Sequence, residues 1–208
     1  MSRLPIFLTI LALVLLPVWS SAPLAAERTY EPPRVEYRAE RLVQRGGRQQ
    51  AMRVHYVPGK ERLDLLGTAA AGNSLILRHD LGQTFVVMPR LGAYGVAPPD
   101  VGAELDAILR SLRLTAEGRE VVEGVATTRY RVRGRLEGRI WLDPRDIPVR
   151  IQGRSEIGGE WQETLIEQRA IEVARQDPSL FEVPPGLGRI DMRDPVWAAL
   201  VRQVINGR

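Results

Sequence analysis

The sequence predicts a β-rich α+β domain, built on one curved antiparallel sheet with a helix inserted midway and a second helix at the end. Alternation of apolar and polar residues with period two runs from Arg34 to Met88, and it returns from Glu120 to about Val173. A helical period separates these two blocks and reappears in the tail. Turn signals divide the alternating blocks into roughly eight to eleven short strands. We therefore expect a sheet of many strands with two helices.

The first 26 residues are expected to be a signal peptide and not part of the fold. Arg3 precedes a near-continuous apolar run from Leu4 to Trp19, and small residues lead on to Ala26. A charged start, an apolar stretch and a small-residue exit are typical of a secretory signal. The run is also shorter than the roughly 20 residues that span a bilayer, which argues against an uncleaved anchor. We expect a soluble, exported, periplasmic protein with no transmembrane segment after signal removal.

In the first block, the strands are separated by glycine turns. Tyr37 and Ala39 alternate with charged residues, as do Val54 and Tyr56 further on. Gly46-Gly47, Pro58-Gly59 and Gly82 mark the turns between successive runs.

A helix is predicted over 100–112, between the two blocks. Asp100 can cap it, and apolar residues follow at the spacing of one helix face: Val101, Leu105, Ile108, Leu109 and Leu112. The tail carries the second helix, with Asp194 as the N-cap, Pro195 at the first position and an apolar stripe from Trp197 to Ile205.

The second block contains a row of arginines that allows two interpretations. Arg129, Arg131, Arg133 and Arg135 share one strand face. Such a row can bind anionic head groups or phosphates. It can equally be the solvated side of a sheet, paired across strands with glutamates, and this is the interpretation we favour.

The composition excludes most enzyme and metal chemistry. The chain has no cysteine, so it has no disulfide, thiolate zinc site, cysteine nucleophile or N-terminal lipid anchor. It has two histidines, and it lacks the phosphate-binding, dinucleotide-binding, serine-hydrolase and zinc-protease motifs. The formal charge of +4 comes from interspersed acidic and basic residues, which does not predict a nucleic-acid partner. We expect no enzyme activity, no catalytic residues, no cofactor and no metal.

Three polar features have a structural and a catalytic interpretation. His79-Asp80 can be a base with its orienting carboxylate, or a histidine at a strand end beside an exposed acid, which we favour. Asp143 and Asp146 flank Pro144 in a turn, where aspartate is common for backbone reasons. His55 is expected to be solvated.

Nine apolar residues are predicted to face inward together. Their shared parity permits either an open cleft for a ligand or a fully packed core, and alternation alone does not distinguish these. The nine are Leu75, Leu77, Phe85, Val87, Tyr130, Val132, Leu142, Val149 and Ile151.

Three stretches, taken together, resemble periplasmic proteins of the LolA/LolB-like superfamily, the outer-membrane lipoprotein-sorting carriers and their uncharacterised relatives. The stretch from Ser179 to Leu187 is the most telling. The segments that carry the resemblance are Tyr56–Arg62 with Ile76–Asp80, Val87–Pro89 and Tyr94; Gly118–Val132 with Trp141–Asp143 and Ile147–Arg150; and Gln176–Gly186.

The resemblance implies an unclosed antiparallel half-barrel whose concave apolar face lies under a helical lid and receives acyl chains. It places a carrier-like domain at 27–187, a lid at 100–112 and a helical extension at 188–208. Phe85, Tyr130 and Val132 are then the best candidates for the lining. Since the chain has no cysteine, it cannot be a lipid-anchored receptor of the LolB kind.

We therefore expect a non-catalytic protein that binds a lipid, an acyl chain or an acylated protein. The alternative is an interaction or envelope-sensing module with a filled core. Such a module would bind an envelope protein through the Trp197 helix or the arginine face.

Overall fold

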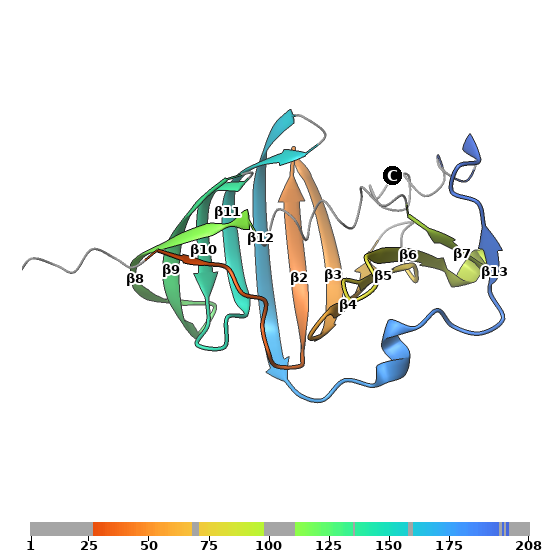
Figure 1. Cartoon of the computed structure of the whole chain (residues 1–208), viewed down its shortest axis with the longest axis horizontal. Coiled ribbons are helices and arrows are strands. Elements are labelled where there is room, and N and C mark those ends of the chain that lie inside the picture. Colours follow the sequence, from red (N-terminus) through yellow and green to blue (C-terminus); the bar gives the residue numbers. More distant parts are fainter. Residues whose placement is uncertain are drawn as a thin grey trace, which may run out of the picture.

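One sheet of 13 strands dominates the computed structural model, which describes residues 27–67, 71–97, 111–134, 136–157, 160–195, 197 and 199. Neighbouring strands are antiparallel except β7 and β13. The order across the sheet is β1-β8-β9-β10-β11-β12-β2-β3-β4-β5-β6-β7-β13 (Figure 1). The strands are β1 Glu27–Thr29, β2 Tyr37–Arg45, β3 Arg48–Val57, β4 Lys60–Leu66, β5 Ser74–Arg78, β6 Gln83–Met88, β7 Ala93–Val96, β8 Arg113–Val122, β9 Val125–Arg133, β10 Leu136–Leu142, β11 Pro148–Ile157, β12 Glu160–Val173 and β13 Gly188–Ile190.

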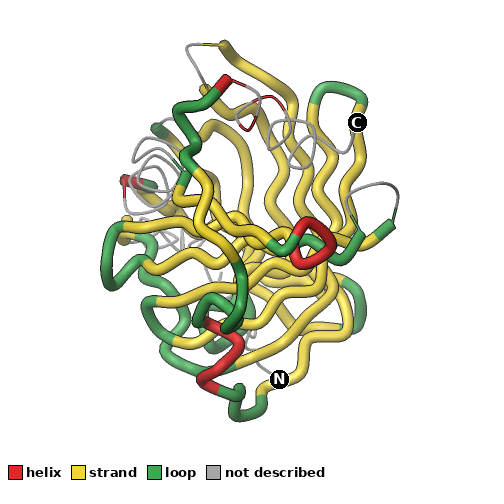
Figure 2. The backbone as a smooth tube through the Cα atoms, turned by 90° about the vertical axis from the view of Figure 1, so that its right-hand side faces the viewer, coloured by secondary structure: helices red, strands yellow, loops and turns green. Residues whose placement is uncertain are grey.

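The predicted α+β class, with a helical lid and a C-terminal helix, was wrong. The described residues form an open, mostly antiparallel sheet and contain no helix of seven or more residues (Figure 2). Their helical segments of three or more residues are the 3-10 turns η1 Pro89–Leu91 and η2 Pro178–Phe181. Most of the helices predicted over 100–112 and 194–205, like the expected signal peptide, lies outside the described residues. Segments without regular structure cover the described part of the sheet instead.

Two meanders make up the sheet. Strands β2 to β7 follow one another in space, as do β8 to β12, and β12 pairs with β2 to join the two sets. The join is irregular, because the register shifts between Arg169 and Glu172, and Ala170 takes a φ of 48° there. A bulge of this kind bends a strand and increases its twist. In Figure 1 the strands turn steadily from β8 to β13, as expected of a strongly curled open sheet.

The sheet has an inner face, which carries the two largest groups of buried apolar side chains, and an outer face. On β2 the inner side chains are those of Tyr37, Ala39, Arg41, Val43 and Arg45, since alternate residues share a face. The first group of buried residues, cluster 1, is Tyr30, Leu112, Leu114, Val132, Leu136, Ile140, Leu142 and Ile151. The second, cluster 2, is Tyr37, Ala39, Val54, Tyr56, Leu63, Leu77 and Ile147.

Irregular segments cover both faces. On the inner face, residues 30–36 run across the strands between β1 and β2 (Figure 1). Tyr30 packs into cluster 1, and the Tyr56 hydroxyl donates to the Pro33 carbonyl at 3.0 Å. On the outer face, η2 contacts β4 and β5, and its Phe181 is 1% exposed. These two segments protect apolar sheet surface as helices do in other folds.

The close approach of β10 and β11 requires glycine. Gly138 pairs with Gly153, and a Cβ on either residue would lie 2.1–2.2 Å from a backbone oxygen of the other strand. Only glycine fits at this separation. Among the described residues, no helix is long and apolar enough to cross a membrane.

Candidate functional site

The inner face becomes progressively more open toward the turn between β2 and β3. Cross-strand pairs on β2 and β3 divide this face into successive rows. Tyr37 and Tyr56 form a buried, stacked row, with ring centres 5.0 Å apart. The row of Arg45 and Arg48, beside the turn, is half-buried to exposed. The inner face is therefore most exposed at the turn end of β2 and β3.

Partly exposed apolar residues lie next to that end of the inner face. Val43 pairs with Ile166 of β12, which pairs in turn with Ile151 of β11. Met52 follows in the next row of β3. Val43, Met52 and Ile166 are only partly buried. Ile166 packs against cluster 1 and Met52 against cluster 2. We call these three residues the apolar floor. The sequence prediction did not include them, although each has the parity of an inward-facing neighbour on its own strand.

A buried ion pair lies beside the apolar floor. The Arg41 guanidinium donates to Glu61 at 2.6 Å and to the Gln168 side-chain oxygen at 3.1 Å, while the Gln168 amide donates to the Pro148 carbonyl. The side chains of Arg41 and Glu61 are 16% and 11% exposed. Burial acts to lower the pKa of Arg41, but the attraction of Glu61 outweighs it and the pKa is raised. Burial also raises the pKa of the neighbouring Tyr37 hydroxyl to about 12. Arg41 is therefore charged and Tyr37 neutral at any physiological pH.

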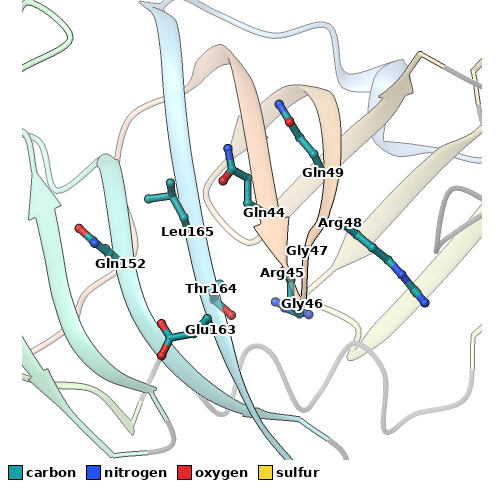
Figure 3. A pocket seen from close by; sticks show the side chains of 10 residues that line it. All are labelled: Gln44, Arg45, Gly46, Gly47, Arg48, Gln49, Gln152, Glu163, Thr164 and Leu165. Carbon is teal, nitrogen blue, oxygen red and sulfur yellow. The ribbon is translucent and has the colours of Figure 1, made fainter.

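A polar pocket of about 320 Å³ lies at the end of the β2–β3 hairpin (Figure 3). Leu165 is the one large apolar side chain that lines it. The side chains of Gln44, Gln152 and Leu165 come from the outer face, whereas Arg45 and Thr164 have inner-face parity, so the pocket wraps around the hairpin end. Most of its lining residues are polar or charged, so a polar or charged group can find partners there. Its full set is Gln44, Arg45, Gly46, Gly47, Arg48, Gln49, Gln152, Glu163, Thr164 and Leu165.

The nine residues predicted to face inward do not all share one face. Tyr130, Val132, Leu142 and Ile151 come together in and around cluster 1. Leu75 and Leu77 lie with cluster 2, and Val149 packs with Val122 and Trp141 in a separate buried group.

Phe85 and Val87 lie on the opposite face from Leu75 and Leu77. Phe85 pairs with Ile76 and contacts the Tyr94 ring, and Val87 pairs with Ser74. Four residues, 79–82, separate β5 from β6, so odd-numbered residues of one strand pair with even-numbered residues of the other. The assumption of one parity on both sides of this turn was wrong, since a one-residue change of register moves every side chain to the other face.

Two members of the arginine row, Arg129 and Arg131, are paired across strands with glutamates, as the favoured interpretation predicted for the row. Glu117, which is 13% exposed, lies within 3.2 Å of Arg129, Arg131 and Arg139, and Glu120 lies 3.1 Å from Arg129. Hydrogen bonds from Arg139 and Arg131 lower the pKa of Glu117. Arg135 lies outside the described residues.

His55 is not solvated as expected. Its Nδ1 lies 3.0 Å from the Gln176 side-chain oxygen and its Nε2 lies 3.5 Å from Asp64. Asp64 also accepts a bond from Ser74 at 2.7 Å, so that the aspartate stands between the serine and the histidine. A serine nucleophile needs the histidine in that central position. This arrangement therefore fastens the segment around Gln176 to the sheet and does not activate Ser74.

The other two polar features have structural partners. Both oxygens of Asp80 accept bonds from Arg78 at 2.9 Å, which lowers the pKa of Asp80. Asp143 accepts bonds from the backbone amides of Arg145 and Ile147, as a turn aspartate does. Within the described ranges, no three histidine, aspartate or glutamate residues cluster in a way that could hold a metal ion.

Comparison with solved structures gives the same architecture. MucB matches 76% of this chain at 15% identity, with a TM-score of 0.51. The chain therefore shares its fold with MucB, which is consistent with the LolA/LolB-like resemblance of the sequence. The sequence resemblance is thus confirmed at the level of the fold. The chain matches 61% of the MucB chain and therefore spans about three fifths of that protein.

Weaker matches include the Pseudomonas aeruginosa MucA/MucB complex and a putative outer membrane lipoprotein-sorting protein domain from Vibrio parahaemolyticus. Their identities are 13% and 11%, and their TM-scores are 0.48 and 0.38. They cover 74% and 73% of this chain, and 58% and 91% of their own. No family model and no curated protein matches the sequence.

Proposed function

We propose that the chain is a non-catalytic periplasmic protein that binds the apolar part of a lipid or acylated molecule on the inner face. The observation that carries this proposal is the gradient of exposure along β2 and β3. Apolar side chains there are buried at one end and partly exposed on the apolar floor at the other. Apolar surface left partly open inside a curved sheet is a common location for a ligand site.

The energy of such binding comes from removing apolar surface from water. Each methylene transferred is worth about 0.8 kcal/mol, so a chain of about 12 carbons supplies on the order of 10 kcal/mol before the cost of ordering. The Arg41–Glu61 pair does not oppose this, because each charge is already matched by the other. No covalent step is involved, in keeping with the structural roles of the polar clusters described above.

A neutral apolar probe tests the proposal. N-phenyl-1-naphthylamine fluoresces when it leaves water, and we expect saturable enhancement with the wild-type protein. Val43→Arg places a charge on the apolar floor and should reduce the enhancement at least tenfold. Leu42→Arg is the matched control, since Leu42 is also partly buried but lies on the outer face beside Glu167. Equal loss in both variants, with both folded by circular dichroism, would contradict the proposal.

One observation favours a second candidate, an interaction module for another envelope protein. Tyr30 covers part of the inner face and is only 5% exposed. Such a buried side chain is expected in a packed core and not in an open cleft. MucB, whose fold is similar, is described in complex with MucA(peri). This candidate predicts no probe enhancement by the wild type, together with a partner whose capture is lost when residues 194–208 are deleted.

A further inference from the structure

Arg45 differs from the other half-buried arginines of the sheet. Arg41, Arg62 and Arg150, for example, each lie within 2.8 Å of a carboxylate. Among the residues that the structure describes, Arg45 is the half-buried arginine for which no carboxylate lies within ion-pair distance. Its Nε, like those of Arg28 and Arg129, is inaccessible to water and has no hydrogen-bond partner, but those two arginines also have a carboxylate partner.

Such a position is costly for a guanidinium group. Arginine keeps its charge in proteins, and burial without a counter-ion is unfavourable. Burial alone lowers the pKa of Arg45, with no carboxylate to offset it. A sheet that pairs its other half-buried arginines so consistently leaves this charge available to a ligand.

The surroundings of Arg45 suit an oxyanion. Arg45 and Arg48 are paired on either side of the Gly46-Gly47 turn, at the polar pocket (Figure 3). Glu163 is the one carboxylate in that lining, against two arginines, so the charged lining is net positive by one.

We propose that Arg45, assisted by Arg48, binds the phosphate or carboxylate group of an amphiphile whose apolar part lies on the apolar floor. This inference rests on the proposed function and names the class of its ligand. Arg45 and Val43 have the same parity on β2, two residues apart and thus about 7 Å along the strand. The head and the first carbons of one molecule can therefore reach both. Guanidinium groups bind such oxyanions through two parallel hydrogen bonds.

Calorimetric titration with dodecyl phosphate and dodecyl maltoside, each below its micellar concentration, tests the inference. We expect Arg45→Gln to weaken dodecyl phosphate binding at least about tenfold, the usual loss for a charge-assisted hydrogen bond. Arg48→Gln should have a smaller effect, because Arg48 is exposed. Binding of the uncharged maltoside should change less than twofold in both variants. Arg53→Gln is the matched control, since Arg53 is an exposed arginine on the outer face of β3.

The outcomes separate the inference from the proposed function. Failure of the wild type to bind either detergent contradicts the proposed function itself. If the wild type binds both detergents and Arg45→Gln weakens both equally, only the role of Arg45 is overturned. The same conclusion follows if Arg53→Gln weakens dodecyl phosphate binding as much as Arg45→Gln does. Inorganic phosphate should bind far more weakly than dodecyl phosphate, and equal affinity would assign the site to a free anion. If Arg45→Gln does not fold, Arg45→Lys is the second variant. It keeps the positive charge, so it should still bind dodecyl phosphate more tightly than dodecyl maltoside.

Discussion

Removal of one partner from the buried Arg41–Glu61 pair should destabilise the protein by about 3 kcal/mol. At 2.6 Å, and with an effective dielectric constant of about 20, the attraction between the two charges is about 6 kcal/mol before desolvation is subtracted. Loss of one member of a buried pair typically costs 3–5 kcal/mol, because an uncompensated charge remains. The lower end applies here, since both side chains retain some exposure.

Urea denaturation of Glu61→Leu measures this cost. The doubly substituted protein Arg41→Met/Glu61→Leu supplies the comparison, because it leaves no unpaired charge and should lose only about 1 kcal/mol. The single variant should therefore be the less stable of the two. A loss below about 1 kcal/mol in Glu61→Leu would refute the argument that an unpaired charge at this site is costly. A double variant at least as unstable as the single variant would refute it as well.

Three further predictions concern the sheet and its cover. Gly153→Ala should cost at least about 1–3 kcal/mol, because its Cβ would lie 2.2 Å from a backbone oxygen, whereas Gly118→Ala, with open space at its Cβ, should be neutral; equal melting temperatures would contradict this. Glu117→Gln should destabilise at pH 7, because the lowered folded-state pKa of Glu117 contributes stability that is full above the unfolded value of 4.5. The difference from wild type should disappear as the pH falls through the folded-state pKa, and a pH-independent difference would show another cause. Phe181→Ala should cost about 3–5 kcal/mol and Leu91→Ala less than about 0.5, since the two side chains are 1% and 52% exposed; similar urea midpoints would contradict the role of η2 as a cover.

Alternation predicted the strands because it reports a property of each strand alone. The long hairpins around Gly46-Gly47 and Asp143–Asp146 lie where the turn residues indicated. The glutamate pairing of Arg129 and Arg131 also followed from the sequence, since charged residues on a solvated face usually find partners across strands. Short edge strands such as β1 and β13 have only three residues, which is too few to establish a period.

Register across turns was the main source of error. The parity of Phe85 relative to Leu75 depends on the number of residues between two strands, and composition does not define where the strands end. The cover of the sheet was equally hidden, because Tyr30 and Phe181 belong to segments with no period at all. The unpaired state of Arg45 depends on which strands are neighbours, and no local pattern reports that.

Native mass spectrometry tests the central claim most directly. The protein is expressed from its full sequence and purified without detergent, then extracted with organic solvent for lipid analysis. The account predicts a stoichiometric adduct of an anionic lipid, lost in Val43→Arg and retained in Leu42→Arg. A clean apo mass that does not change on addition of fatty acids or phospholipids would contradict the account and favour the interaction module.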